Sequence, residues 1–210
     1  MATTKNKPTG YFKYLLAIDC ETTGLDFNSD HPSNGHQALS WGVIVLESDT
    51  FTPVEELYVE IKWNEESKAA READPKFGKR AEEIHGLTYD YLEENGVTEE
   101  EAVELIGSLI MKYWGPTVSI RTLGHNVHLF DLDFLRSMFR RHGIDLKFGN
   151  RHYDTNSIGW AAFETFTSDQ LFELIGFDPR GKHNSLDDIK MTIAAAKVVR
   201  QIVQKAINNE

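Results

Sequence analysis

The chain has 210 residues, of which 40% are hydrophobic, and a formal net charge of −11. This length and apolar content suit one globular domain with a full core. The negative charge argues against a protein that coats long nucleic acids, because phosphate binding depends on Lys and Arg. It leaves open an enzyme that grips one nucleic-acid end through metal ions. No apolar stretch reaches the ~18 residues that a membrane span needs.

Residues 1–10 are polar and contain Pro8 and Gly10. We expect a flexible arm there, followed by one domain over residues 11–210. The arm lacks the apolar run of a signal peptide. Cys20 is the only cysteine, which excludes an intrachain disulfide and a cysteine zinc site and agrees with a reducing compartment. The expected location is the cytoplasm, with no membrane partner.

Three strands are predicted first, over residues 14–21, 38–47 and 56–63. The first is a continuous apolar run, and the third alternates apolar and polar residues. A turn-rich loop, residues 28–37, separates the first two strands. A hairpin-like connection joins the second to the third, so an antiparallel arrangement is expected.

Helices dominate the rest of the predicted chain. The segment 98–115 has the clearest signals, because Thr98 and Glu101 can form a capping box and Gly115-Pro116 ends the pattern. The other helices are predicted over residues 74–86, 131–143, 168–176 and 185–207, with a strand over 117–126 and a short strand near His152. This order predicts an α/β fold with a mixed five-stranded sheet flanked by helices.

Asp19 and Glu21 end the first predicted strand. Strand side chains alternate faces, so the two carboxylates point the same way while Cys20 points the other way. Neighbouring carboxylates repel each other, and one is protonated unless a cation lies between them. Mg²⁺ or Mn²⁺ is the natural cation for oxygen ligands. A pair that simply faces water explains this motif alone equally well.

Three further stretches carry candidate residues. Asp131 opens a predicted helix just after a strand-like segment that ends in Asn126, where an acid also suits the helix dipole. His183 precedes the last helix, and Asp188 lies on the inner half of that helix, where an acid needs a partner. His85 lies in the turn that ends the helix predicted at 74–86. By itself it is an ordinary capping or surface histidine.

Together these stretches resemble the DEDDh class of 3′→5′ exonucleases, which includes polymerase proofreading subunits, oligoribonuclease and ribonuclease T. "IDCETTGL" matches the first family block, "GHNVHLFDLDFL" the second, and the H-x-x-x-x-D of His183 and Asp188 the third. "IHGLT" resembles a further element near the substrate end. The blocks follow the family's order from about residue 14 to 195. Their spacing assigns the acid positions to Asp131, not Asp133, and to Asp188, not Asp187.

The resemblance implies the ribonuclease-H-like fold, in which such carboxylates meet at one edge of the sheet. It implies that four acids hold two divalent ions, Mg²⁺ or Mn²⁺, about 3.5–4 Å apart. It also implies that His183 is the general base, for which a pKa near ~6.5 is suitable. The implied catalytic set is Asp19, Glu21, Asp131, His183 and Asp188. The implied product is a nucleoside 5′-monophosphate from the 3′ end of single-stranded nucleic acid.

Further expectations concern the substrate. In the family, the stretch that matches Thr22, Thr23, Gly24 and Leu25 contacts the terminal nucleotide. His85 and Phe130 would stack on or flank the last bases, although Phe130 fits a core position equally well. Asn126 would bond the sugar or orient a neighbour.

Cations near these blocks are candidates for phosphate contacts. Arg136 and Arg140 share a face of one predicted helix, and Arg180 and Lys182 flank His183. For each group, an ordinary solvated surface is the competing interpretation. Ser185 stands where the family usually has a small apolar residue, and it can cap the last helix.

The substrate and the partners stay open at this point. DNA is the favoured substrate, and an exoribonuclease that acts on short RNA or RNA 3′ ends is the first alternative. A polymerase acting in trans and a second copy of the chain are the protein partners considered. A non-catalytic binding module is the second alternative, but it should have lost a metal acid or the histidine. A zinc hydrolase is excluded because the cluster is all carboxylate and no helical H-x-x-x-H pair accompanies it.

Overall fold

The structure, a computed structural model of the chain, describes residues 12–25, 35–116 and 119–208. The expected flexible arm, residues 1–10, and residues 28–34 of the predicted loop lie outside the described residues. Within the described ranges, no helix has both the length and the apolar character that crossing a bilayer requires.

Five strands form one mixed sheet in the order β3-β2-β1-β4-β5. The β1–β2 and β2–β3 pairs are antiparallel, while β1–β4 and β4–β5 are parallel. The strands are β1 Tyr14–Thr22, β2 Ala38–Glu47, β3 Pro53–Glu60, β4 Thr122–Gly124 and β5 Tyr153–Asp154. The predicted five-stranded sheet, with three antiparallel strands first, is therefore confirmed.

Two strands differ in their bounds from the prediction. β3 runs over Pro53–Glu60 rather than 56–63. Ile61 still donates to the Leu39 carbonyl of β2 but makes only an isolated bridge, to Val97, so the ladder ends there. The strand predicted over 117–126 is reduced to β4, which pairs with β1 only at Leu16 and Ala17. Beyond that point a side chain, described below, takes the place of a strand partner.

The structure describes eight helices in these ranges. They are α1 Glu65–Ala73, α2 Lys79–His85, α3 Tyr89–Asn95, α4 Glu99–Trp114, α5 Asp131–Arg141, α6 Thr155–Phe163, α7 Ser168–Leu174 and α8 Ser185–Asn208. The helix predicted over 74–86 is shorter because Gly78, at φ +78°, and Gly86, at φ +79°, bound it in left-handed conformations. Helices α1, α3 and α6 were not predicted.

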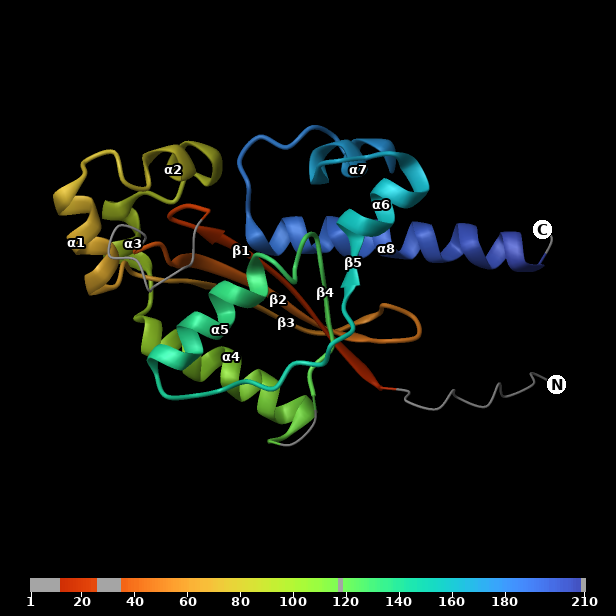
Figure 1. The fold of residues 1–210 in the computed structure, drawn as a ribbon, viewed down its shortest axis with the longest axis horizontal. Helices are drawn as coiled ribbons and strands as arrows, with labels where there is room; N and C mark the ends of the chain where they lie inside the picture. Colours follow the sequence, from red (N-terminus) through yellow and green to blue (C-terminus); the bar gives the residue numbers. More distant parts are fainter. Residues whose placement is uncertain (1–11, 26–34, 117–118, 209–210) are drawn as a thin grey trace.

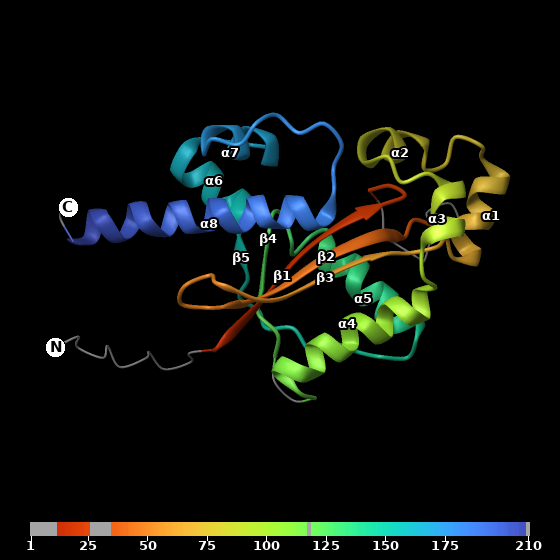
Figure 2. The same ribbon diagram turned by 180° about the vertical axis from the view of Figure 1, so that it is seen from behind.

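The sheet has a different helical cover on each face. Leu16 and Ile18 pack on one face into a core with Ile106 of α4 and Phe139 of α5. On the other face, the intervening β1 residues Leu15 and Ala17 pack with α8 residues that include Ile189 and Ile193. Figures 1 and 2 show α8 along one face of the sheet and α4 and α5 on the other. Asp19 and Glu21 continue the alternation of Leu15 and Ala17, so they face α8.

Helices α1 to α3 form a unit at the tip of β1 (Figures 1 and 2). Its core joins Trp63, Phe77 and Leu92 to Leu39 of β2. The ring of His36 stacks on Phe77 with the two centroids 4.4 Å apart. This packing holds α2 beside the end of β1. Helices α6 and α7 pack against α8, so the end of β1 lies between α2 and α7.

Candidate active site

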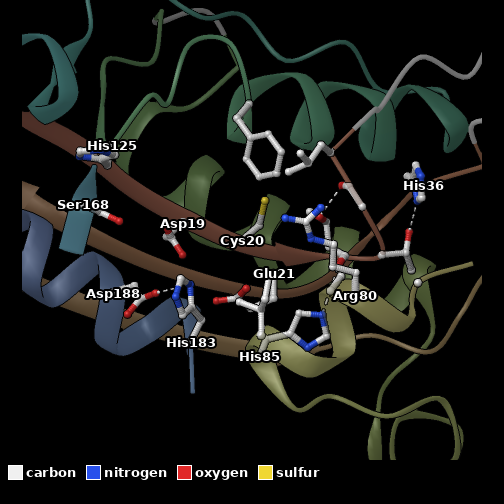
Figure 3. Close-up of a pocket in the computed structure, with 18 of the residues that line it drawn as sticks. Asp19, Cys20, Glu21, His36, Arg80, His85, His125, Ser168, His183 and Asp188 are labelled. Carbon is white, nitrogen blue, oxygen red and sulfur yellow. Dashed lines mark hydrogen bonds and ion pairs between the residues drawn. The ribbon is translucent and has the colours of Figure 1, made fainter. Parts of the chain in front are cut away.

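The end of β1 presents two carboxylates toward α8. Asp19 lies opposite Gly42 in the β1–β2 register, and Glu21 lies opposite Ser40. Glu21 is 8% exposed, and the ladder shifts register just after it. The strand pairing on β2 holds the backbone of both acids. Figure 3 shows the two side chains directed into the same space as His183 and Asp188.

Asp131 approaches β1 from the side of β4. As the first residue of α5 it is 1% exposed. β4 ends at Gly124, and the Cys20 N–H donates to Asp131 Oδ1 at 3.0 Å. The carboxylate thus replaces a strand partner at Cys20, the residue between Asp19 and Glu21. Asp131 Oδ2 is buried without a hydrogen-bond partner among the described residues.

Asp188 is held in the first turn of α8, where it is 5% exposed. The helix begins close to β2: a Cβ at Gly42 would lie 2.2 Å from the Ser185 carbonyl oxygen. Asn184 caps the helix, because its Oδ1 accepts from the N–H groups of Leu186 and Asp187. Ser185 is therefore not the cap; its hydroxyl lies 2.9 Å from that of Ser40 in β2.

His183 lies beside Asp188 in the loop before α8. Its Nδ1 is 3.6 Å from Asp188 Oδ2, and ligand atoms of Glu21, His183 and Asp188 all lie within 4.8 Å of one another. The backbone N–H of His183 donates to the Ile84 carbonyl at 3.2 Å, and Lys182 Nζ donates to the Glu83 carbonyl. The loop is thus fastened to α2 on the opposite side of the site.

Burial shifts the pKa of every acid in this cluster. It raises the pKa of Glu21 to about 8, of Asp131 to about 7 and of Asp188 to about 6. Burial also raises the pKa of Asp19 well above its usual value, and the charges of Asp131, Glu21 and Asp188 raise it further. The Arg180 guanidinium lowers the pKa of Asp19, Glu21 and Asp188. Arg180 therefore compensates the negative charge of the cluster only in part.

The pKa of the His183 imidazole is lowered, whereas the pKa values of the acids are raised. Burial lowers its pKa, and the charge of Arg180 lowers it further. The ring is therefore neutral at neutral pH. A neutral imidazole with one free nitrogen can accept a proton.

The cluster opens into a cleft of about 770 Å³, whose walls come from β1, α2, α7 and α8. Six of the seven predicted substrate residues line it: Thr22, Thr23, Gly24, Leu25, His85 and Phe130. Asn126 is not among the described lining residues; it is exposed at φ +59°, and its N–H donates to Asp154 Oδ1. Leu25 is 84% exposed, as a residue that contacts a ligand from the rim would be.

His85 has both ring nitrogens engaged. Nδ1 accepts from the Leu87 N–H at 2.9 Å, so Nε2 carries the hydrogen and donates to the Thr22 carbonyl at 3.2 Å. Burial lowers the pKa of His85 to about 4, which keeps the ring neutral. This histidine fastens α2 to the end of β1. Its contact with substrate stays a prediction.

Several predicted phosphate contacts are occupied by acids of the chain itself. Arg136 pairs with Asp133 at 3.2 Å, and Arg140 lies 3.4 Å from Asp145. Arg180 is 2.6 Å from Asp188 Oδ2 and is bound to α7 as well. No pattern in the sequence predicts that last arrangement, because only the fold brings α7 to Arg180.

The donor set fits divalent cations. Four carboxyl groups lie close to one another, and Asp131 Oδ2 is buried without a partner among the described residues. Their raised pKa values mean that the ionised forms are unfavourable unless a cation neutralises them. Oxygen ligands of this kind suit Mg²⁺ or Mn²⁺.

Comparisons with known proteins give a family match and several similar structures. The sequence model of the RNase_T family, described as Exonuclease, matches residues 16–196. DNA polymerase III PolC-type of Thermotoga petrophila is 25% identical over 180 residues, which cover 85% of this chain and 11% of the polymerase. E. coli Exonuclease I in complex with dA16 is 21% identical, with a TM-score of 0.67, over 90% of this chain and 41% of that one. The complex with dT13 is 20% identical, with a TM-score of 0.70, over 94% and 43%.

The chain thus spans less than half the length of these relatives. The structural likeness confirms the ribonuclease-H-like fold, with strand order 3-2-1-4-5 and flanking helices. The family match includes all three blocks, from Asp19 to Asp188. The chain therefore belongs to the RNase_T family of DEDD exonucleases.

Proposed function

We propose that this protein is a metal-dependent 3′→5′ exonuclease that removes nucleoside 5′-monophosphates from single-stranded nucleic acid. The observation that carries the proposal is the convergence of three acids and a histidine at one end of a cleft, namely Asp19, Glu21, Asp188 and His183. Asp131 adjoins them through its bond to the Cys20 N–H, and its charge acts on Asp19. The family membership supports the reaction class. The cleft supports a strand end, since its lining combines an acidic floor with apolar and aromatic side chains.

The acids would hold the ions. Asp19, Glu21, Asp131 and Asp188 would bind two Mg²⁺ or Mn²⁺ ions, with Asp131 Oδ2 as the unpartnered buried donor. When bound, such ions acidify water and stabilise charge on the phosphate and the leaving 3′ oxygen. The rigid β1–β2 pairing would keep Asp19 and Glu21 in place.

His183 would take the proton of the attacking water. Its Nδ1 lies toward Asp188, which leaves Nε2 as the proton acceptor. Its lowered pKa keeps it neutral before the reaction. Thr22 to Leu25 and Phe130 would bracket the terminal nucleotide, because they line the cleft next to the acids.

The solved relatives favour DNA as the substrate. Exonuclease I was crystallised with dA16 and dT13 oligonucleotides. The match to a PolC-type DNA polymerase supports a polymerase, acting in trans, as a partner. Dimerisation with a second copy of the chain stays a prediction.

The test uses 5′-labelled 12-mers of single-stranded DNA and RNA, with Mg²⁺ or with EDTA. We expect a metal-dependent ladder that shortens from the 3′ end, and faster cleavage of the DNA. Asp19→Ala and His183→Ala should each abolish the ladder while the variants keep the circular dichroism spectrum of the wild type. A faster RNA ladder would favour the exoribonuclease alternative.

Absence of cleavage of both substrates, with Mn²⁺ bound normally, would refute a free-standing nuclease. The binding-module alternative would then become the better description.

A further inference from the structure

Arg180 is a buried cation beside the acidic cluster. It lies in the segment between α7 and α8, and its side chain is 8% exposed. Arg180 lines the cleft. A substrate phosphate could bind it only by displacing the acids that Arg180 already binds.

The guanidinium of Arg180 is fixed on several sides. Nη1 donates to Asp188 Oδ2 at 2.6 Å, Nε donates to Asp169 Oδ1 at 2.7 Å, and Nη2 donates to Ser168 Oγ at 2.8 Å. The guanidinium carbon lies 5.1 Å from the centroid of the Phe172 ring. Three of these partners belong to α7 and one to α8. The rigid planar fork therefore transmits the position of α7 to Asp188.

This contact restricts the carboxylate of Asp188. With Oδ2 bound to Arg180, rotation about the Cβ–Cγ bond would break a charge-assisted hydrogen bond. Among the described residues, no hydrogen bond engages Asp188 Oδ1, so this second oxygen is available to an ion. Partners of this kind orient metal-ligating carboxylates, and their loss weakens metal affinity by about 10- to 100-fold.

We propose that Arg180 is a positioning residue that orients Asp188 for metal binding and is itself fixed by Ser168 and Asp169 of α7. The inference rests on the metal site of the proposed function. It extends the support of that site to α7, a helix that supplies no predicted ligand. The competing interpretation is that the charge of Arg180 merely repels the ions, and the two interpretations predict opposite changes in affinity.

Isothermal titration of the full chain with Mn²⁺ separates them. We expect Arg180→Met and Arg180→Lys both to bind Mn²⁺ about 10- to 100-fold more weakly, since neither keeps the fork. Asp169→Asn should also weaken binding, although Asp169 is not a predicted ligand. The double variant Arg180→Met/Asp169→Asn should bind no more weakly than Arg180→Met, because both changes break one chain of contacts.

Arg200→Met is the matched control. Arg200 also stacks on an aromatic ring, 3.5 Å from the centroid of Phe51, and donates to the backbone carbonyls of Ser48 and Asp49. It lies on α8 roughly 18 Å beyond Asp188 along the helix axis. Its loss should leave Mn²⁺ affinity unchanged.

Unchanged or tighter Mn²⁺ binding by Arg180→Met, or wild-type affinity in Arg180→Lys, would overturn the proposal. If Arg180→Met fails to fold by circular dichroism, Asp169→Asn and Ser168→Ala decide in its place: weaker binding supports the proposal, and wild-type affinity refutes it. The metal site itself would be refuted if the wild-type chain bound no Mn²⁺. It would also be refuted if Asp188→Asn bound Mn²⁺ as tightly as the wild type.

Discussion

At the end of β1, carboxyl groups are buried whose negative charge the cations of the chain do not fully neutralise. Asp131 has one oxygen bonded to the Cys20 N–H and the other unpartnered among the described residues. Glu21 and Asp188 are also buried and have raised pKa values. Without metal, the folded chain therefore favours the protonated form of these groups. The unfolded chain, with ordinary carboxyl pKa values near ~4, does not.

We expect the metal-free protein to lose stability as the pH rises from about 5 to 8. The folded-state pKa values are about 8 for Glu21, 7 for Asp131 and 6 for Asp188. In this range the folded state holds more protons than the unfolded state, so the free energy of unfolding falls with pH. One pKa unit corresponds to ~1.4 kcal/mol, so the three groups together give a fall approaching ~8 kcal/mol.

Urea denaturation at pH 5, 6.5 and 8 measures this fall, in EDTA and in Mn²⁺. Mn²⁺ should suppress it, because the ion takes the place of the protons. Asn at position 131 cannot ionise, so Asp131→Asn should make the EDTA curve less steep, while Glu21 and Asp188 still titrate. A wild-type curve that is flat in EDTA would contradict the pKa shifts.

At the scale of the elements, the backbone at the start of α8 approaches β2 so closely that no side chain fits between them. Gly42 lies beside the Ser185 carbonyl, and the hydroxyls of Ser40 and Ser185 are 2.9 Å apart. This approach fixes the height of the first turn of α8 above the sheet. The turn carries Asp188, so a change at β2 reaches the acidic cluster through the helix.

Gly42→Ala should therefore damage both the fold and the site. The added Cβ would meet the Ser185 backbone at 2.2 Å, so we expect a loss of about 1–3 kcal/mol in the free energy of unfolding and weaker Mn²⁺ binding. Gly107→Ala in α4 is the control. There the Cβ meets only the Phe139 ring at 3.5 Å, and helix propensity favours Ala by about 0.5–1 kcal/mol. Thermal melts and Mn²⁺ titrations of both variants decide. Equal stability and equal Mn²⁺ affinity of the two variants would show that α8 does not approach β2 closely.

Elements with a clear local pattern of apolar or capping residues could be predicted from the sequence. Elements that depend on contacts with distant parts of the chain could not. The apolar run of β1 and the capping box of α4 are local signals, and both are confirmed. Helix α1 buries only Ser67 and so has no apolar stripe to detect. The fork of Arg180 depends on α7, whose position no local pattern encodes. The five catalytic positions could be named because their motifs hold the spacing of the family, but their roles stay predictions.

Over the whole molecule, charge is distributed unevenly around the cleft. The chain carries a formal net charge of −11, and four of its acids form the cluster. Lys76 and Arg80 nevertheless line the same cleft from the α2 side, and both are exposed. We expect this rim to contact backbone phosphates of the substrate while metal ions compensate the acidic floor.

Arg80→Met should raise the KM for a single-stranded 12-mer by about 3- to 10-fold and reduce the salt dependence. Each lost phosphate contact lowers the slope of log affinity against log salt by ~0.7 for single strands. Lys79→Met is matched in charge and lies on the same helix but outside the described lining of the cleft. Steady-state kinetics at fixed Mg²⁺ and varied NaCl measure both variants. The same response in both would mean that net charge alone matters.

The acids that form the cluster are far apart along the chain: Asp19 and Glu21 lie near its start, Asp131 lies in its second half, and Asp188 lies in the first turn of the last helix. Contacts between such distant segments form late, because closing long loops is entropically unfavourable. During synthesis, a growing chain that has not reached α8 holds an incomplete set of the proposed metal ligands. The proposed nuclease activity would then arise only after α8 has been made, and chains that terminate before α8 would be harmless to the nucleic acid around them.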